Sequence, residues 1–410
     1  MSARLSATRL AVIMCGAEAL SMTGFAAYTT LLPVLQREWG LSNSEAGLIG
    51  GIYYAGFVAA TPILTSLTDR VDPRRIYLAS CLISFVGAAG FALFADGLAT
   101  ALLFQILIGV GLGGTYMPGL KVLADQLEGK TQSRAVGFYT ASFGIGSSLS
   151  IVICGAIGAS LGWKWAFAYG AAGPLIAALL VSTLMPPGRT RAAHEPAPAL
   201  FDFRPVLRNH KTLPYIIGYT LHNYELFGQR SWMVAFLVFC ASLRADGTAL
   251  AGAATLAAMI NLLGPVGSLT GNELAMRYGR SRVIFTAMCL SGLMACGLGW
   301  LAGLPLAVVF LIMCVHYCLM LGDSAALTSG VIAAAPPELR GATMAAYSFI
   351  GFTGAFLAPL TFGVVLDFAG GNQDRAAWAL AFMSIGIFGA LSPLARWFYL
   401  RRASAERGGT

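Results

Sequence analysis

Charged side chains are scarce in this sequence. Asp, Glu, Lys and Arg make up 11% of the 410 residues, whereas a soluble globular domain usually has about a quarter. Hydrophobic residues reach 57%, and the mean hydropathy is +0.73. The composition therefore excludes a soluble globular protein and predicts an all-α protein that crosses a membrane many times.

Signatures of most enzymes are also missing. The sequence has no nucleotide-binding loop, no assembled metal-ligand motif, no nucleophile–base spacing and no soluble segment long enough for a catalytic domain. We therefore expect no enzyme activity, no direct use of ATP, no cofactor and no metal. A cleavable signal peptide is not expected either, since the first apolar run after Arg4 and Arg9 is too long for one.

The eight cysteines lie mostly within apolar runs, where they act as small hydrophobic side chains. Cys314 and Cys318 are close to His316 in sequence. On a helix, however, both point roughly 160° away from it. These three residues therefore cannot form one metal site, and we expect the cysteines to be free.

Twelve apolar segments are long enough for membrane-spanning helices, which need about 17–25 residues. A Pro-rich, basic stretch divides them into two sets of six. We predict two pseudo-symmetric six-helix bundles, 1–184 and 213–400, joined by a cytoplasmic linker (185–212) with a short amphipathic helix and followed by a tail, 401–410. The segments are Leu10–Leu35, Glu45–Leu67, Ile76–Phe94, Leu98–Leu123, Ala135–Leu161, Trp165–Leu184, Leu213–Cys240, Thr248–Leu274, Val283–Leu301, Leu306–Ala333, Ala342–Val365 and Ala377–Tyr399.

The basic residues are distributed unevenly over this topology. With the N-terminus inside, 20 of the 26 Lys and Arg residues fall in the inner segments. This is the positive-inside pattern of a protein with two cytoplasmic termini. The net charge of +8 is therefore explained by the basic residues of the inner segments, which set the orientation in the membrane. No nucleic-acid partner is expected.

The two halves resemble each other in sequence. Arg134 and Arg340 each precede a helix of small residues, and a Ser-Phe pair follows eight and nine positions later in both. Glu18 and Glu225 occupy comparable depths in the first helix of each half. Repeated halves with a binding site between them are a transporter architecture.

A loop motif carries a family resemblance. Residues 65–75 read TSLTDRVDPRR and residues 272–280 read NELAMRYGR. Both are similar to the G-x-L-A-D-R-x-G-R-K loop of the major facilitator superfamily, which the chain resembles along its whole length. The resemblance implies alternating access, with this loop as a charged latch at the inner gate; simple positive-inside anchoring is the alternative. The residues assigned to gating are Asp69, Arg70, Arg134 and Arg277.

Two positions depart from patterns of that superfamily. Gln105 stands four residues before Gly109, where members often carry an arginine, so an arginine-mediated proton step is not expected there. The run Gly144–Ser148 has the glycines of the drug-antiporter motif but no proline, which disfavours drug–proton exchange. The sequence HNYELFGQRSWMVAFL in span 7 is most similar to a branch grouped with cyanate-permease-like carriers.

That stretch of span 7, Tyr219–Trp232, is the most informative part of the chain. Ionisable groups inside a membrane are costly and mark functional sites, so its polar face must line a protein interior or a water-filled cavity. Arg230 is expected to bind an anion through its planar guanidinium or, alternatively, to pair with Glu225 or Glu18. At roughly 100° per residue, the residues that share this broad face are His222, Asn223, Glu225, Gln229 and Arg230.

Proton coupling is the role expected of the acids and histidines inside the spans. His222 and Glu225 lie one turn apart and can share a proton, since histidine titrates near neutral pH; a structural pair is the alternative. Glu18 is the repeat-related counterpart of Glu225 and is assigned the same role, with a structural hydrogen bond as its alternative. In span 10, His316 and Asp323 share a helix face within roughly 20°. We assign His316 to the cavity and Asp323 to proton coupling, or else to bonding at helix ends.

The predicted function is secondary active transport in the inner, or plasma, membrane. A small polar, anionic organic solute would move by symport with protons, so that an ion gradient takes the place of a cofactor. The expected partners are the substrate and the lipid bilayer, and the expected state is a monomer. Proton-driven efflux of drugs or toxic compounds is the alternative. The residues expected to bind substrate are Arg230, Gln229, Asn223, Tyr28, Tyr139, Asn261 and His316.

Overall fold

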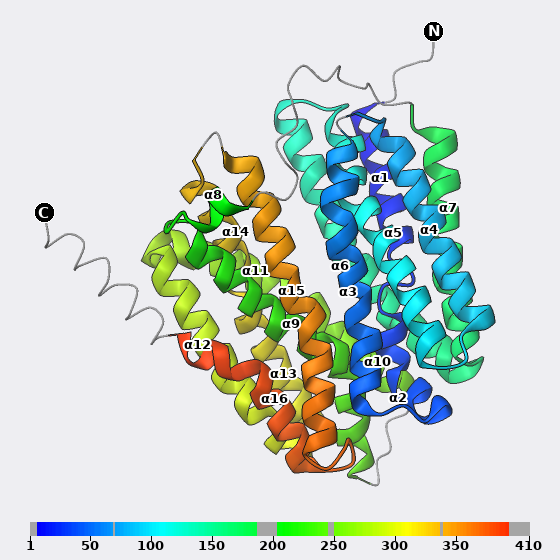
Figure 1. Ribbon diagram of the computed structural model, residues 1–410, viewed down its shortest axis with the longest axis vertical. Coiled ribbons are helices and arrows are strands. Elements are labelled where there is room, and N and C mark those ends of the chain that lie inside the picture. The colour runs from blue at the N-terminus through cyan, green and yellow to red at the C-terminus, as the bar shows by residue number, and fades with distance from the viewer. Residues whose placement is uncertain (1–5, 69, 187–202, 245–249, 337–338, 393–410) are drawn as a thin grey trace, which may run out of the picture. The chain divides into compact units, whose positions relative to one another are not determined.

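The computed structural model describes residues 6–68, 70–186, 203–244, 250–336 and 339–392, and every regular element in these ranges is a helix (Figure 1). Nine helical segments of the described residues are long and apolar enough to cross a membrane. The all-α membrane fold is therefore confirmed, and the count of twelve spans stays a prediction.

The described residues divide into two compact units. Unit 1 lies within Met1–Asp202 and Gly247–Leu262, and unit 2 within Phe203–Asp246 and Leu263–Thr410. Unit 1 contains α1 (Ala7–Ser21), α2 (Ala27–Trp39), α3 (Asn43–Leu67), α4 (Pro73–Phe94), α5 (Leu98–Ala124), α6 (Gly129–Ser160), α7 (Trp163–Leu184) and α10 (Leu250–Leu262). Unit 2 contains α8 (Arg204–Leu207), α9 (Leu213–Ser242), α11 (Gly264–Tyr278), α12 (Arg280–Leu298), the 3-10 helix η1 (Gly299–Gly303), α13 (Leu306–Leu321), α14 (Ser324–Ala334), α15 (Arg340–Phe368) and α16 (Arg375–Ala390).

Helix α10 belongs to unit 1 although it follows the linker in sequence. Its small residues allow a close approach to α6, where a Cβ atom on Gly155 would lie 2.3 Å from the Cβ of Ala254. The Asn261 side chain also donates a hydrogen bond to Ser148 Oγ at 2.7 Å. The compact units thus differ from the predicted halves, 1–184 and 213–400, in the placement of this helix.

The first span is interrupted between α1 and α2, at residues 22–26. Backbone groups freed by a break inside a membrane need partners within the protein. Ser150 of α6 provides them, because its hydroxyl donates to the Thr23 carbonyl at 2.7 Å and accepts from the Ala26 N–H at 3.1 Å. A continuous helix over Leu10–Leu35 is therefore not formed.

Spans 8 and 10 are interrupted as well. Leu263 separates α10 from α11, and Pro265 has no N–H with which to continue a helix. Gly322 and Asp323 separate α13 from α14. At Gly271, a Cβ atom would lie 1.8 Å from the Gly322 carbonyl oxygen, so only glycine allows α11 to approach this break. The approach fixes the position of Asp323 in unit 2.

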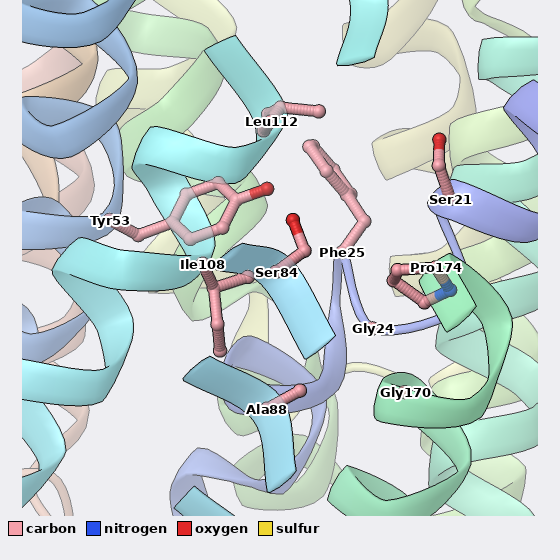
Figure 2. A pocket seen from close by; sticks show the side chains of 10 residues that line it. All are labelled: Ser21, Gly24, Phe25, Tyr53, Ser84, Ala88, Ile108, Leu112, Gly170 and Pro174. Carbon is pink, nitrogen blue, oxygen red and sulfur yellow. The ribbon is translucent and has the colours of Figure 1, made fainter. Parts of the chain in front are cut away.

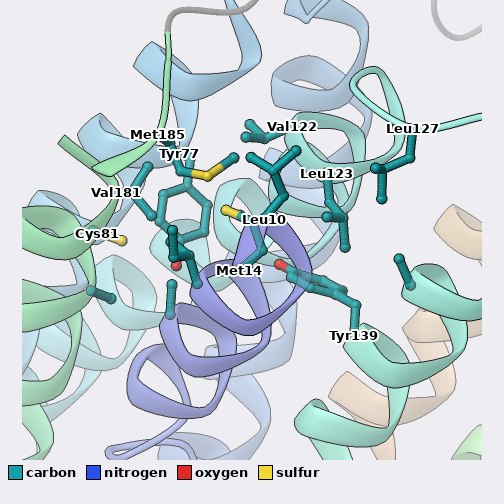
Figure 3. Packing of buried hydrophobic residues seen from close by; sticks show 14 residues of the cluster. Leu10, Met14, Tyr77, Cys81, Val122, Leu123, Leu127, Tyr139, Val181 and Met185 are labelled. Atoms are coloured by element: carbon teal, nitrogen blue, oxygen red, sulfur yellow. The ribbon is translucent and has the colours of Figure 1, made fainter. Parts of the chain in front are cut away.

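Apolar packing holds each unit together. In unit 1, Met14, Tyr77 and Tyr139 belong to a buried cluster that joins α1, α4, α5, α6 and α7 (Figure 3). In unit 2, the buried Trp232 of α9 stacks on Phe362 and donates its indole N–H to the Pro359 carbonyl at 3.0 Å. Because both partners belong to α15, this packing fixes the helix that carries the polar stretch.

The linker contains a short helix, as expected, but α8 has only four residues. Val206 of α8 is buried against Ile216, Val331 and Tyr347. Residues 187–202 of the linker and the tail 401–410 lie outside the described residues. All eight cysteines are free, which confirms that expectation.

Candidate functional site

The polar stretch of span 7 lies in α9, and most of its polar side chains are buried in unit 2. His222, Asn223, Glu225 and Gln229 are between 0% and 4% exposed, and Arg230 is half-buried. Burying ionisable groups costs free energy unless other groups hydrogen-bond or pair with them. The partners of these side chains therefore decide what the stretch can do.

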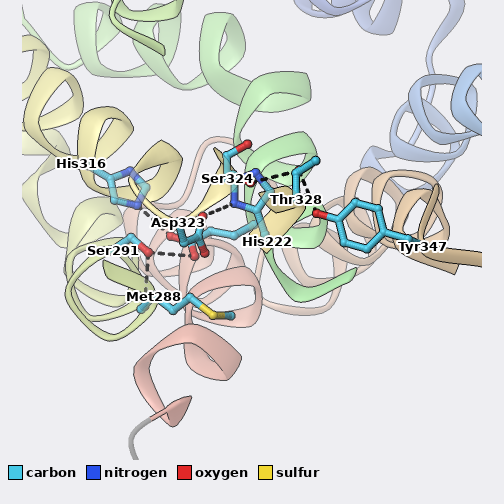
Figure 4. A network of polar contacts seen from close by, with 9 residues as sticks. His222, Met288, Ser291, His316, Asp323, Ser324, Thr328 and Tyr347 are labelled. Carbon is cyan, nitrogen blue, oxygen red and sulfur yellow. Dashed lines mark hydrogen bonds and ion pairs between the residues drawn. The ribbon is translucent and has the colours of Figure 1, made fainter. Parts of the chain in front are cut away.

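His222 makes a close contact with Asp323, with 2.6 Å between Nδ1 and Oδ1 (Figure 4). This contact is an ion pair when the imidazole is protonated. Asp323 precedes α14 at the N-cap position, where a carboxylate normally accepts from the first helical N–H groups. Its side chain makes no such capping bond. The carboxylate therefore contacts His222 and does not cap α14.

Glu225 is held by two other helices of unit 2. His316 Nε2 of α13 lies 3.0 Å from Glu225 Oε1, and the Ser291 hydroxyl of α12 donates to Glu225 Oε2 at 3.1 Å. The expected direct pair between His222 and Glu225 is thus replaced by two pairs that both lead to span 10. His222 and Glu225 lie one turn apart and therefore on one face of α9. This face contacts Asp323 and His316 of span 10.

Aromatic rings pack against the first pair. The Tyr219 ring stacks on His222 with 6.0 Å between centroids and on Tyr347 of α15 with 4.1 Å. The Tyr347 and Thr328 hydroxyls lie 3.0 Å apart, and Thr328 donates to the Ser324 carbonyl at the start of α14 (Figure 4). Side chains of α9, α14 and α15 therefore surround the break that carries Asp323.

Arg230 contacts a hydroxyl and an aromatic ring. Its Nη2 donates to the Tyr317 hydroxyl at 3.1 Å, and its Cζ lies 5.7 Å from the centroid of the Phe227 ring. The two buried amides on this helix are less well satisfied. Asn223 Nδ2 and both polar atoms of Gln229 have no hydrogen-bond partner within the described ranges.

Glu18 is fully buried in unit 1. Its Oε2 accepts from the Tyr139 hydroxyl at 2.8 Å and from the Ser21 hydroxyl at 3.4 Å. The Tyr139 hydroxyl also lies 3.1 Å from the Thr115 carbonyl oxygen. A phenol has one hydrogen to donate, so the carbonyl and the carboxyl group compete for it.

A small cavity lies beside the break between α1 and α2 (Figure 2). Its volume is ≈ 10 Å³, which is about the space of one water molecule. Ser21, Tyr53 and Ser84 are the hydroxyl-bearing residues of its lining. Since Ser21 also donates to Glu18, the cavity and the buried acid share one polar neighbour.

The remaining predicted binding residues are held by contacts inside unit 1. The Tyr28 hydroxyl donates to the Ala46 carbonyl at 2.8 Å. Asn261 contacts both Ser147 and Ser148 of α6. Both side chains therefore join helices, and the structure gives them packing partners that the sequence pattern did not show.

The predicted gating residues lie at exposed positions or outside the described residues. Asp69 is not among the described residues. Arg70 and Arg134 are exposed, and Arg277 pairs with Glu273 on the same helix at 3.2 Å. The latch stays a prediction.

Sequence reasoning did not identify Ser291, Tyr317 or Thr328 as parts of the site. Tyr317 could have been found as the neighbour of His316. Ser291 and Thr328 are each one of three hydroxyl residues in their helices, and no sequence signal distinguishes them from the others. Among the described residues, no group of three or more His, Cys, Asp or Glu side chains could hold a metal ion.

The chain is similar in sequence to known membrane transporters. Residues 14–251 match the family described as "Major Facilitator Superfamily". A protein of Cupriavidus pinatubonensis (strain JMP 134 / LMG 1197) named "Probable 4-methylmuconolactone transporter" is 25% identical over 268 residues, which are 64% of this chain and 61% of that protein. This match thus spans less than two thirds of its relative's length.

Two further comparisons cover more of the chain. A "Gallate transporter" of Pseudomonas putida is 23% identical over 375 residues, which are 82% of this chain and 80% of that protein. A crystal structure of a bacterial homolog to the human lysosomal transporter Spinster has a TM-score of 0.77 at 17% identity and covers 97% of both chains. At this identity, the structural likeness shows a common fold.

Proposed function

Because the chain belongs to the Major Facilitator Superfamily, it is a multi-pass membrane transporter and not an enzyme, and we propose that it moves a small aromatic carboxylate together with protons. The observation that carries this proposal is the setting of Arg230. Its half-buried guanidinium is held between the Tyr317 hydroxyl and the Phe227 ring. A planar cation beside an aromatic surface suits a ligand that has both a carboxylate and a ring.

Two further observations support this class of substrate. The buried amides of Asn223 and Gln229 retain hydrogen-bonding capacity, which the hydroxyl or carbonyl groups of an organic acid could use. Gallate, the solute in the name of one relative, is an aromatic carboxylate. The proton-carrying groups of the proposal are Glu18, His222, Glu225 and Asp323.

The test of this function is a ligand screen on the purified protein. A ligand that binds only the folded state at 100 times its Kd stabilises it by about 2.7 kcal/mol. Gallate and benzoate should therefore raise the melting temperature, and acetate, amino acids and lipophilic cations should not. If only lipophilic cations stabilise the protein, drug efflux replaces this proposal.

Transport itself requires the lipid bilayer. In proteoliposomes, an inwardly directed proton gradient should drive accumulation of the stabilising acid, and a protonophore should abolish that accumulation. Uptake that is the same with and without the gradient would contradict proton coupling.

The proposed location is the inner, or plasma, membrane, with both chain ends in the cytoplasm. The support is the positive-inside distribution of Lys and Arg. A fluorescent reporter that folds only in the cytoplasm, fused after Thr410, should therefore be bright, and an alkaline phosphatase fused there should be inactive. The opposite pair of results would reverse the orientation.

A further inference from the structure

Helix α8 is a short segment that packs against three longer helices of unit 2 (Figure 1). Val206 of α8 is 1% exposed. Its buried cluster contains one or more residues of α9, α14 and α15, among them Ile216, Val331 and Tyr347. The hydroxyl of Thr212, the residue before α9, donates to the Val206 carbonyl at 3.3 Å. One face of α8 is therefore anchored in unit 2.

The other side of this segment is exposed and basic. Arg204, Arg208 and Lys211 are all exposed. The Arg208 N–H donates to the Arg204 carbonyl at 3.1 Å, so the two arginines lie one helical turn apart, on one face. The sequence has no Asp or Glu between Phe203 and Tyr224. No acid within this stretch therefore offsets the three positive charges.

Exposed apolar side chains lie beside these charges. Leu207 is 41% exposed and directly precedes Arg208, and Pro205 is exposed as well. An apolar side chain is more stable in contact with acyl chains than with water. Basic residues next to exposed apolar ones are typical of a segment that lies in the interfacial region of a membrane.

The segment lies at the polar edge of the bilayer, because residues 208–212 are all that separate α8 from α9, the helix of span 7. Ile217, in the second turn of α9, is 51% exposed, as a side chain that faces lipid would be. Lysine and arginine near the membrane surface attract anionic lipids. An arginine guanidinium can also bind a phosphate through two parallel hydrogen bonds. The charge, the apolar side chains and the depth of this face thus fit one kind of partner.

We propose that the exposed face of α8 binds the headgroup of an anionic phospholipid. Arg204 and Arg208 hold the phosphate, Lys211 adds a third positive charge, and Leu207 contacts the acyl chains. In the proposed orientation this lipid belongs to the cytoplasmic leaflet. The bound lipid stabilises the docked position of α8 and therefore its contacts with α9, α14 and α15. This site does not depend on which solute the protein moves.

The first experiment uses the wild-type protein, purified in a neutral detergent. Phosphatidylglycerol and phosphatidylcholine with the same acyl chains are the two probes, and the melting temperature is measured with each. A ligand that binds the folded state raises this temperature. Phosphatidylglycerol should raise it by about 2 °C or more above the value with phosphatidylcholine. Equal melting temperatures with the two lipids would overturn the proposal.

The second experiment locates the binding, with native mass spectrometry as the measure of affinity for phosphatidylglycerol. The variant carries Arg204→Gln, Arg208→Gln and Lys211→Gln together. Each basic residue near an anionic lipid surface contributes about fivefold to binding, so the triple variant should bind about 100-fold more weakly. Its fold in phosphatidylcholine should be unchanged, because all three residues are exposed.

The matched control removes the same charge from three separate helices. Its affinity for phosphatidylglycerol should stay within about twofold of wild type, because the loss of a distributed charge is largely screened by salt. If both triple variants lose affinity equally, the lipid responds to net charge alone and the site at α8 is contradicted. The control substitutions are Arg9→Gln in α1, Arg75→Gln in α4 and Arg282→Gln in α12, at three exposed positions.

Two further measurements identify the occupant as a lipid. Leu207→Gln keeps all three charges and removes the apolar contact, so phosphatidylglycerol should bind about threefold more weakly or less tightly still. Inorganic phosphate, at the same concentration as the lipid, should leave the melting temperature unchanged, because it has no acyl chains. If phosphate stabilises the protein as well as phosphatidylglycerol does, a soluble anion is the ligand and the lipid assignment fails.

Discussion

Replacing Arg230 with alanine is expected to weaken gallate binding by about 30-fold or more, because removing one member of a hydrogen-bonded charge pair costs about 2–5 kcal/mol. The fold should survive this change. Arg230 is half-buried and its side-chain contacts include the Tyr317 hydroxyl and the Phe227 ring, neither of which is a buried charge. Calorimetric titration with gallate measures the loss directly.

Two further variants separate charge from geometry. Arg230→Lys keeps the charge but loses the planar fork that binds a carboxylate through two hydrogen bonds, so its affinity should lie between wild type and Arg230→Ala. Tyr317→Phe keeps the guanidinium and removes the hydroxyl that positions it, so the loss should be smaller. Gallate binding of wild-type strength in Arg230→Ala would show that the guanidinium serves only internal contacts.

The polar face of span 7 could be read from the sequence because its signal is local. An ionisable residue in a long apolar run is unusual wherever it occurs, so His222, Glu225 and Arg230 were identified without knowledge of the fold. The partners of His222 and Glu225, in contrast, are distant in sequence and could not be predicted from it. Helix periodicity places His222 and Glu225 on one face, but which residues of span 10 they meet depends on how α9 crosses α13.

The interrupted helices show a second limit of sequence reasoning. Hydropathy averages over a window, so spans 1, 8 and 10 read as continuous. The local signals were present, since Gly264 precedes Pro265 and Gly322 precedes Asp323, and glycine or proline within apolar segments often marks a break. The partner of the first break could not be predicted, because Ser150 is supplied by a different span.

An isolated polar residue inside a span need not bind substrate. Tyr28 and Asn261 were assigned to substrate because polar side chains in spans are uncommon. In the structure, the Tyr28 hydroxyl bonds a backbone carbonyl, and Asn261 bonds two serines of α6. A buried polar group needs a partner whether or not it has a function, and sequence cannot show that such a partner is already present.

Replacing Glu18 with glutamine is expected to stop proton-driven accumulation while leaving the fold and the exchange of substrate intact. The reason is the single hydrogen of the Tyr139 hydroxyl. When Glu18 is ionised, this hydrogen is donated to Oε2. When Glu18 is protonated, its own hydrogen is donated to Tyr139, whose hydroxyl then turns to the Thr115 carbonyl. Rotation of one hydroxyl therefore satisfies both protonation states, which suits a group that binds and releases a proton.

Glutamine reproduces only the protonated state, because its amide donates to Tyr139 and holds no proton that can be released. We therefore expect gradient-driven uptake in proteoliposomes to be abolished, because a side chain that cannot bind and release a proton cannot couple uptake to the proton gradient. Exchange of labelled for unlabelled gallate at equal pH should stay within about twofold of wild type, because exchange requires no net proton movement.

The matched control for Glu18→Gln is Glu38→Gln. Glu38 is an exposed glutamate of unit 1 whose carboxylate accepts from the Trp163 indole, and its substitution should leave gradient-driven uptake unchanged. Full accumulation by Glu18→Gln would instead make Glu18 a neutral structural acid, held by Tyr139 and Ser21, and would confine proton coupling to unit 2.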